Sequence, residues 1–272
     1  MTSVFGSAVT ERSARTDLYA SPRHGLNVED CLFYHTMEIP TIGVVVGRWD
    51  LRAGVREYLG GVDAAGKRVL ELGTASGYLC FMMEQSGAEV VAYDLSHEQD
   101  WDMVPFADVN REHARAGRRE QIRRLNNGWW LAHEKLNSSA RAVYGSIYEV
   151  PDEIGPVDVV TYGAILLHLR DPFLALQSGL RLARETVVVT EMMPQGPSVE
   201  AAPNSLGFMP DPATRLPNET WWSIPPSVVQ RMIGVLGFDS EVSYHQQLCD
   251  GKPQQLYTVV GHRARGNVAV ES

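Results

Sequence analysis

Short hydrophobic runs recur along the chain and alternate with stretches that have helical spacing. Five of these runs have the length and composition of buried parallel strands, namely 69–72, 89–93, 141–144, 157–162 and 185–190. Segments 78–83 and 171–182 instead space their hydrophobic residues as helices do. Two more extended runs, 241–248 and 255–260, are separated by CDGKPQ and predict an antiparallel hairpin. The pattern therefore predicts an α/β fold around a largely parallel sheet.

The loop after the first predicted strand is rich in glycine. Gly73 and Gly77 flank three small residues, and Ser76 is placed to cap the helix that follows. The second strand ends in Asp94, whose carboxylate is able to accept hydrogen bonds from two vicinal hydroxyls. This segment predicts a β-α-β unit with glycines where the backbone must approach a ligand.

The spacing of these glycines argues against a dinucleotide. Proteins that bind NAD use G-x-G-x-x-G, but Ala75 and Tyr78 occupy the second and third glycine positions here. Glu71, two residues before the first glycine, would also face a pyrophosphate unfavourably. The sequence ELGTASG instead resembles motif I of the class I S-adenosyl-L-methionine (SAM) methyltransferases, and ILLHLRDP resembles the segment that lines their reaction site.

This resemblance extends over about residues 43–263. It implies the class I methyltransferase fold, a Rossmann-like seven-stranded sheet that is mostly parallel with an antiparallel last strand. The implied cofactor is SAM, with S-adenosyl-L-homocysteine (SAH) as product. Ser146 stands where many members of the family have an acid for the adenine amine, so its hydroxyl and the Ile147 backbone are expected to serve adenine. The implied cofactor-binding residues are Glu71, Gly73, Thr74, Ala75, Gly77, Asp94, Leu95, Ser146, Ile147 and Gly163.

The same resemblance divides the chain into a core and its additions. The expected divisions are an N-terminal arm and cap segment at 1–47, a SAM-dependent methyltransferase domain at 48–263 and a flexible tail at 264–272. The long stretch between Asp94 and the third strand predicts a helical insertion at about 96–140. A stretch rich in Pro, Gly and Met predicts an acceptor-side loop at about 192–222. Hydrophobic spacing over 49–59 predicts a further helix.

Composition and charge narrow the classes of function. The 272-residue chain is 44% hydrophobic and 21% charged, as globular proteins usually are, and no run resembles a membrane helix. A net charge of −9 argues against broad capture of nucleic acid. Cys31, Cys80 and Cys249 are too scattered to indicate disulfides or a zinc site. These features fit a cytoplasmic protein without a membrane partner, and they leave the oligomeric state open, a homodimer included.

The predicted insertion is rich in arginine. Its arginines are Arg111, Arg115, Arg118, Arg119, Arg123 and Arg124. One hypothesis is that they attract an anionic acceptor, namely a carboxylate, a phosphate or RNA. The other, which is the commoner case, is a solvated helix face with Glu112 and Glu120 as partners. Trp129 and Trp130 are expected to pack the insertion onto the core, although one of them could stack on adenine.

Methyl transfer from a sulfonium requires no protein nucleophile, but a base helps when the acceptor is a hydroxyl or an acidic carbon. His168 is the first candidate because it follows the fourth strand, and a structural histidine bonded to Asp171 is the alternative. His35 and Glu191 are the second candidates. Acids such as Asp102 are too dispersed to predict a metal site.

The acceptor is expected to contact the aromatic residues that flank the core. Tyr34, His35, Trp221 and Trp222 are the predicted substrate-binding residues, and they favour an apolar or planar small molecule. The leading hypothesis is a small-molecule methyltransferase acting on a secondary metabolite or a sugar derivative. One alternative is modification of a wobble uridine in tRNA by a related transferase. The other is a methyltransferase-fold protein, such as a cyclase, that binds SAM without transferring its methyl group.

Overall fold

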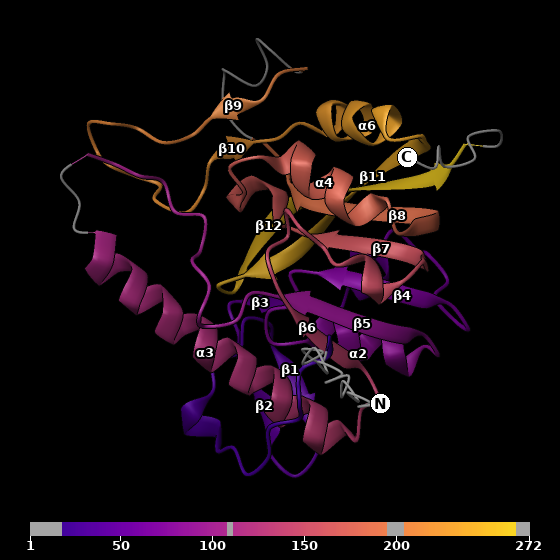
Figure 1. The fold of residues 1–272 in the computed structure, drawn as a ribbon. Helices are drawn as coiled ribbons and strands as arrows, with labels where there is room; N and C mark the ends of the chain where they lie inside the picture. Colours follow the sequence, from indigo (N-terminus) through magenta and orange to yellow (C-terminus); the bar gives the residue numbers. More distant parts are fainter. Residues whose placement is uncertain (1–17, 108–110, 195–203, 265–272) are drawn as a thin grey trace, which may run out of the picture.

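The computed structural model describes residues 18–107, 111–194 and 204–264 and shows a sheet with helices on both faces (Figure 1). The strand order is β3-β11-β12-β8-β7-β4-β5-β6. The strands are β3 (Trp49–Asp50), β4 (Arg68–Leu72), β5 (Glu89–Asp94), β6 (Arg141–Tyr144), β7 (Val157–Gly163), β8 (Ala183–Met192), β11 (Phe238–Cys249) and β12 (Lys252–Arg263). Strands β4 to β8 are parallel, and β12 runs antiparallel between β8 and β11. The predicted class I topology is therefore confirmed.

The sheet has eight strands rather than the predicted seven, because β3 adds two residues to its edge beside β11. The prediction of a helix over 49–59 is correspondingly wrong in its first half, and α1 covers only Val55–Tyr58. The Trp49 amide donates to the Tyr34 carbonyl at 3.1 Å, and its carbonyl accepts from the Thr36 amide at 2.7 Å. Trp49 therefore pairs with a distant segment and is unavailable for a helix.

Two hydrophobic cores cover the two faces of the sheet. The longer helices are α2 (Tyr78–Gln85), α3 (Arg111–Leu136), α4 (Pro172–Leu180) and α6 (Pro226–Val235). Leu176 and Ile233 belong to the core beneath α4 and α6, whereas Leu79 and Trp129 belong to the core beneath α2, α3 and the N-terminal segment. Successive residues of β5 contribute to opposite cores, as expected for a strand buried on both sides.

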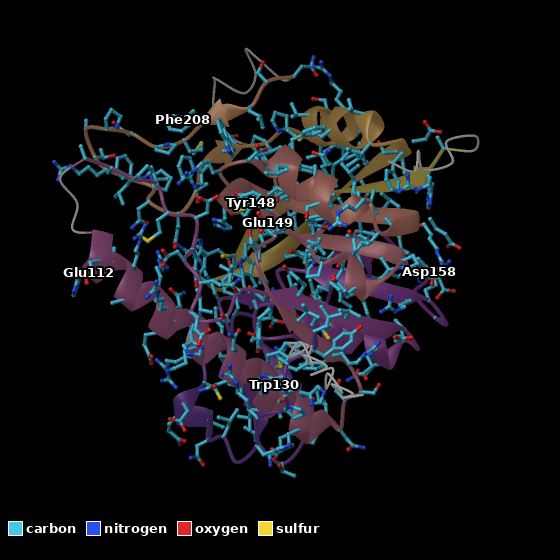
Figure 2. The ribbon with its side chains drawn as sticks, viewed as in Figure 1. Glu112, Trp130, Tyr148, Glu149, Asp158 and Phe208 are labelled. Atoms are coloured by element: carbon cyan, nitrogen blue, oxygen red, sulfur yellow. The ribbon has the colours of Figure 1, made fainter. Side chains whose placement is uncertain are left out.

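Short elements complete the description. They are the 3-10 helices η1 (Val28–Asp30), η2 (Asp152–Ile154) and η3 (Leu166–His168) and the hairpins of β1 (Met37–Ile39) with β2 (Gly43–Val45) and of β9 (Gly207–Phe208) with β10 (Trp222–Ser223). Phe208 lies in β9, and Trp130 lies on α3 (Figure 2). Residues 1–17 of the predicted arm and cap segment and residues 265–272 of the predicted tail lie outside the described residues.

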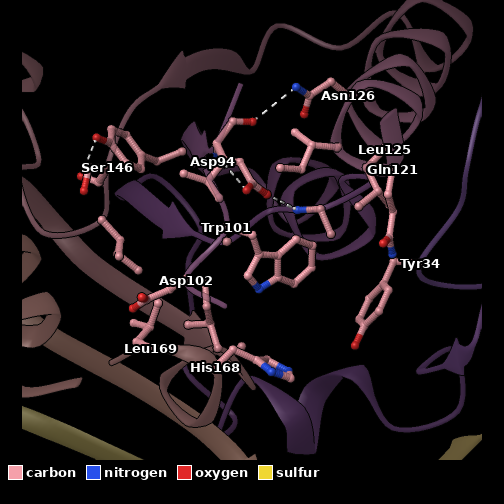
Figure 3. A pocket seen from close by; sticks show the side chains of 18 of the residues that line it. Tyr34, Asp94, Trp101, Asp102, Gln121, Leu125, Asn126, Ser146, His168 and Leu169 are labelled. Carbon is pink, nitrogen blue, oxygen red and sulfur yellow. Dashed lines mark hydrogen bonds between the residues drawn. The ribbon is translucent and has the colours of Figure 1, made fainter. Parts of the chain in front are cut away.

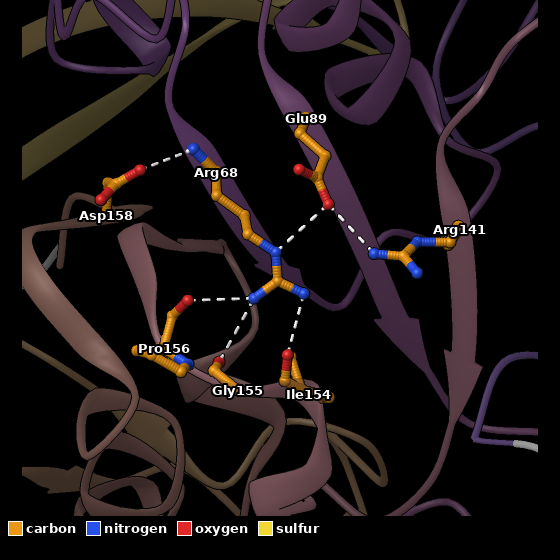
Figure 4. Close-up of polar contacts among 7 residues, drawn as sticks. All are labelled: Arg68, Glu89, Arg141, Ile154, Gly155, Pro156 and Asp158. Carbon is orange, nitrogen blue, oxygen red and sulfur yellow. Dashed lines mark hydrogen bonds and ion pairs between the residues drawn. The ribbon is translucent and has the colours of Figure 1, made fainter.

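The amino ends of the parallel strands are held in register by a polar cluster (Figure 4). Glu89 accepts from Arg68 at 3.2 Å and from Arg141 at 3.0 Å, which links the starts of β4, β5 and β6. The Arg68 guanidinium also donates to the Ile154 carbonyl at 2.8 Å, and its amide donates to Asp158 at 2.8 Å. These contacts tie the amino ends of the strands to one another, and parallel α/β sheets bind their ligands at the opposite, carboxyl ends.

The glycine loop after β4 differs from prediction in one detail. Ser76 does not cap α2; Gly77 is the N-cap residue, with φ +89, and no side chain caps it. The Ser76 hydroxyl, which is fully buried, instead accepts from the Tyr34 amide at 2.9 Å. Ser76 therefore joins the N-terminal segment to the glycine loop.

Candidate cofactor and acceptor site

A cavity opens at the carboxyl ends of the central parallel strands (Figure 3). Its floor comes from residues at or just after the carboxyl ends of β4, β5, β6 and β7, and its other walls come from Tyr34, the 100–102 loop and α3. The lining residues on the floor are Gly73, Ala75, Tyr93, Asp94, Leu95, Ser146, Ile147, Tyr148, Gly163, Ala164, Ile165, His168 and Leu169. A site in this position is where parallel α/β sheets bind ligands.

Asp94 and the glycine loop form the most ordered part of the cavity. The Asp94 carboxylate accepts from the Ala75 amide at 2.7 Å and from the Leu95 amide at 2.7 Å, one bond to each oxygen. Burial raises the pKa of Asp94, while the two amide hydrogen bonds lower it. Gly73 has φ +86, and a Cβ atom there would lie 2.4 Å from Ile165 Cδ1. The turn therefore requires glycine at this position.

Seven of the ten predicted cofactor-binding residues line this cavity. They are Gly73, Ala75, Asp94, Leu95, Ser146, Ile147 and Gly163. The other three, Glu71, Thr74 and Gly77, do not line the cavity. Glu71 and Thr74 are buried, and burial raises the pKa of Glu71 to about 7. Gly77 faces Phe81 and Trp129, so its missing side chain makes room for packing.

The predicted adenine residues follow β6. The Ser146 carbonyl accepts from the Tyr93 hydroxyl at 2.9 Å, and its side-chain oxygen accepts from the Tyr148 amide at 3.3 Å. A hydroxyl can also donate, so the Ser146 side chain retains a hydrogen-bond donor. Ile147 is 9% exposed and lines the cavity. The residues at this end therefore combine a hydroxyl with an apolar wall.

His168 lies in η3 at the other end of the cavity and lines it. Its Nδ1 lies 2.5 Å from the Glu219 carbonyl, which accepts the ring proton. Asp171, the partner considered from sequence, instead accepts from the Leu174 amide and caps α4. Burial lowers the pKa of His168, so the ring is neutral at neutral pH and Nε2 keeps its lone pair.

The second candidates for a base lie outside the cavity lining. His35 is 7% exposed, its Nδ1 has no hydrogen-bond partner, and burial lowers its pKa to about 4. Glu191 is 1% exposed and accepts from the Leu166 amide at 2.7 Å. Burial raises the pKa of Glu191 to about 8. Both side chains are enclosed by the core and do not line the cavity.

Only some of the predicted acceptor residues line the cavity. Tyr34 lines the cavity, whereas Trp221 and Trp222 do not. The Trp221 indole donates to the Asp102 carbonyl at 2.6 Å, and the Trp222 indole donates to the Arg170 carbonyl at 3.2 Å. These two tryptophans attach the 204–223 segment to the loops around the cavity.

Several lining residues were not predicted from sequence. Gln121, Ile122, Leu125 and Asn126 come from α3, and Asp100, Trp101 and Asp102 come from the loop before it. The helical residues recur at i, i+1, i+4 and i+5, which places them on one face. That spacing was visible in the sequence, but many helix faces show it. Only the fold directs this face toward the cavity.

The arginines of the insertion have partners within the described structure. The contacts are Arg115 and Arg119 with Asp100 at 3.5 and 2.9 Å, Arg118 with Glu219, Arg123 with Glu120 at 2.6 Å, and Arg124 with the Cys31 carbonyl at 2.9 Å. The side chain of Arg111 lies outside the described residues, and Glu112 is exposed near the start of α3 (Figure 2). The arrangement favours the ion-paired helix face over an anion site.

The two tryptophans of the insertion belong to the core. Trp129 and Trp130 are each 2% exposed, and the Trp130 indole donates to the Tyr144 hydroxyl at 3.0 Å. Neither lines the cavity. In the described part of the chain, no three His, Cys, Asp or Glu side chains are grouped to hold a metal ion. No helix in the described ranges is long and apolar enough to cross a membrane.

Comparisons with solved structures identify the fold. Magnesium protoporphyrin IX methyltransferase from Synechocystis PCC 6803, solved with bound SAH, is 13% identical with a TM-score of 0.51; the match covers 79% of this chain and 82% of that one. An O-methyltransferase family protein from Burkholderia thailandensis is 14% identical with a TM-score of 0.51, covering 80% of this chain and 57% of that one. A putative methyltransferase from Bacillus halodurans C-125 is 11% identical with a TM-score of 0.51, covering 78% and 99%.

Comparisons of sequence give the family. A search of curated proteins found no match. A family model described as a methyltransferase domain matches residues 50–226, which is more than half of the chain and includes the glycine loop, Asp94 and His168. The strand order and the antiparallel β12 agree with that assignment. The chain therefore belongs to the methyltransferase-domain family, within the class I SAM-dependent methyltransferase superfamily.

Proposed function

We propose that the protein transfers a methyl group from SAM to a small-molecule acceptor, releasing SAH. The observation that carries this proposal is the position of Asp94. Its carboxylate lies at the end of β5, opposite the glycine loop, in a cavity that no described lysine or arginine lines. A sulfonium and an ammonium suit such an acidic lining, whereas the pyrophosphate of a dinucleotide does not.

The residues at the cofactor end fit SAM. Each Asp94 oxygen accepts one amide hydrogen bond, and a carboxylate offers about four lone-pair sites, so each oxygen retains capacity for a ribose hydroxyl. The left-handed turn at Gly73 keeps the backbone of the loop close to the cavity. Ser146 and Ile147 would contact the adenine, with the Ser146 hydroxyl as a donor or an acceptor.

The acceptor end supplies a base. Bound SAM would provide an electrophilic methyl group, and the protein residues would position the acceptor and remove its proton. We assign His168 as the residue that accepts this proton at Nε2, because its Nδ1 proton is held by the Glu219 carbonyl. Tyr34 and Trp101 lie at the same end (Figure 3). Removal of such a base typically costs about 10² to 10⁴ in rate.

The test is product formation. Purified protein is incubated with SAM and a panel of phenols, amines and sugar derivatives, and mass spectrometry detects SAH together with an acceptor that has gained one CH₂ unit. We expect His168→Gln to lose turnover while it retains SAM binding, and Asp94→Ala to lose both. Methyl transfer would be contradicted if the wild type bound SAM tightly but, like the variants, formed no product with any member of the panel.

A further inference from the structure

The loop Asp100–Trp101–Asp102 forms one wall of the cavity and is not required by the methyl transfer proposed above. All three residues line the cavity, and the Trp101 indole lies near His168 and Asp94 in the close-up (Figure 3). Trp101 is half-buried, with part of its ring facing the cavity. An aromatic ring between two acidic residues in sequence sets conditions on the ligand.

Arg118 of α3 supports this indole without entering the cavity. Its guanidinium carbon lies 5.1 Å from the centre of the Trp101 ring, within the range of a cation–π contact. The same guanidinium contacts the Glu219 carboxylate and donates to Gln121 Oε1 at 2.7 Å. Arg118 does not line the cavity, so it fixes the indole from the outside. Its charge is already matched by Glu219.

The acids that flank Trp101 are held in place by their own contacts. Asp102 Oδ2 accepts from the Arg170 amide at 2.6 Å and from the Tyr148 hydroxyl. Asp100 is contacted by Arg119 at 2.9 Å, from a helix position that does not line the cavity. Asp100 and Asp102 line the cavity, whereas the arginines that pair with them, namely Arg115, Arg119 and Arg170, do not. A ligand on Trp101 would therefore meet the carboxylates first.

We propose that Trp101 is the platform on which the acceptor stacks, and that the acceptor is an uncharged planar molecule. This proposal rests on the proposed function, because it assumes that Asp94 and the glycine loop hold SAM. A flat ring stacked on the indole would gain attraction beyond that of its buried area alone. An acceptor carrying a carboxylate or a phosphate would be repelled by Asp100 and Asp102, since like charges a few ångströms apart disfavour each other.

The position of Arg118 strengthens the choice of an uncharged ring. A cation near one part of the indole lowers the attraction of the ring for a second cation, whereas it favours an electron-rich neutral ring. His168 lies at the same end and accepts a proton without any fixed charge of its own at neutral pH. Phenol-like or heteroaromatic acceptors with a removable proton meet these conditions. Arg118 of the arginine-rich helix therefore affects the choice of ligand by contacting Trp101, and it does not bind the ligand directly.

Saturation-transfer NMR on SAH-loaded protein tests this proposal with isosteric pairs of probes. The pairs are 4-hydroxybenzamide with 4-hydroxybenzoate, and 6-hydroxy-2-naphthamide with 6-hydroxy-2-naphthoate. SAH binding is measured first by calorimetry, so its absence would count against the proposed function, whereas SAH binding without any probe binding would count against this proposal alone. We expect an amide to bind at least about tenfold more tightly than its carboxylate partner, which corresponds to about 1.4 kcal/mol.

Variants separate the proposal from its main competitor. Trp101→Ala should weaken amide binding about tenfold and leave SAH affinity unchanged. Trp101→Phe should retain most of the amide affinity, because it keeps an aromatic ring. The double variant Asp100→Asn with Asp102→Asn should reduce the preference for the amide. If the acceptor were an anion bound by Arg118, the carboxylate probes would bind more tightly than the amides, and Arg118→Gln would weaken the binding of the carboxylate probes. Either of those results would overturn the proposal, as would loss of SAH rather than amide binding in Trp101→Ala.

Discussion

The two ends of the cavity are built in different ways. At the cofactor end, Asp94 and the glycine loop are fixed by backbone: strand ends, amide donors and a left-handed turn place them. At the acceptor end, side chains tie distant segments together, because the Trp221 indole donates to the Asp102 carbonyl and the His168 ring donates to the Glu219 carbonyl. Backbone-built sites tolerate few substitutions, whereas sites built from side-chain contacts between loops can change one contact at a time. We therefore expect substitutions at the acceptor end to change which acceptor binds while they leave cofactor binding unchanged.

Glu191 tests how the sheet supports the acceptor end, because its carboxylate accepts from the Leu166 amide at the start of η3. Burial raises its pKa to about 8. A carboxyl group with a raised folded-state pKa stabilises the fold while it is protonated, and this contribution is lost as the pH rises from the unfolded-state value, about 4.3, through 8. Glu191→Gln keeps the acceptor oxygen and cannot ionise.

Between pH 5 and pH 8, Glu191→Gln should therefore gain roughly 3 kcal/mol in free energy of unfolding relative to wild type. Urea titrations at both pH values measure the difference. Glu241→Gln, exposed on β11, is the control and should show no such gain. A wild-type stability that changes between pH 5 and pH 8 no more than that of Glu191→Gln would mean that Glu191 is not held protonated by the core.

Gly73→Ala tests the backbone-built end. The new Cβ would meet Ile165 Cδ1 at 2.4 Å in a backbone with φ +86, so strain and a clash combine to about 2–3 kcal/mol. Gly61→Ala is a matched control, because Gly61 has φ +68 and a Cβ atom added there would have no atom within 4 Å. It should lose only the backbone strain, about 1 kcal/mol. Equal losses in chemical denaturation would show that close packing of the glycine loop adds nothing.

Trp221→Phe tests the end built from side-chain contacts and has the smallest expected effect. The variant keeps the aromatic packing but loses the indole hydrogen bond to the Asp102 carbonyl, which is worth about 1 kcal/mol. SAH affinity should not change, because Trp221 does not line the cavity. Thermal unfolding and calorimetry measure the two quantities. A large loss of SAH binding would show that the two ends are not separable.

Much of the fold could be predicted from the sequence because its signals are local. The hydrophobic runs give the strands, and the loop from Gly73 to Gly77 with Asp94 gives the β-α-β unit. Asp171 and Pro172 likewise mark the start of α4, where the Asp171 side chain caps the helix. Each of these features depends on residues close in sequence.

The parts that sequence reasoning missed depend on distant contacts. The short strand β3 exists because β11 offers an open edge to Trp49, and Ser76 serves the Tyr34 amide rather than α2. Trp101 fell within the predicted insertion at about 96–140 and was given no role, since nothing local shows that α3 and Arg118 would direct it toward a cavity. The glycine loop and Asp94 could be predicted because they belong to one β-α-β unit, whereas the wall around Trp101 could not, because segments distant in sequence assemble it.

Calorimetric titration with SAM, SAH and NAD tests the central claim most directly, which is that Asp94 and the glycine loop bind SAM. We expect micromolar SAM affinity, about −8 kcal/mol, no NAD binding, and a loss of about 100-fold in Asp94→Ala. Asp239→Ala, exposed on β11, is the matched control and should bind as wild type does. SAM binding that is unaffected in Asp94→Ala, or a preference for NAD, would contradict the account.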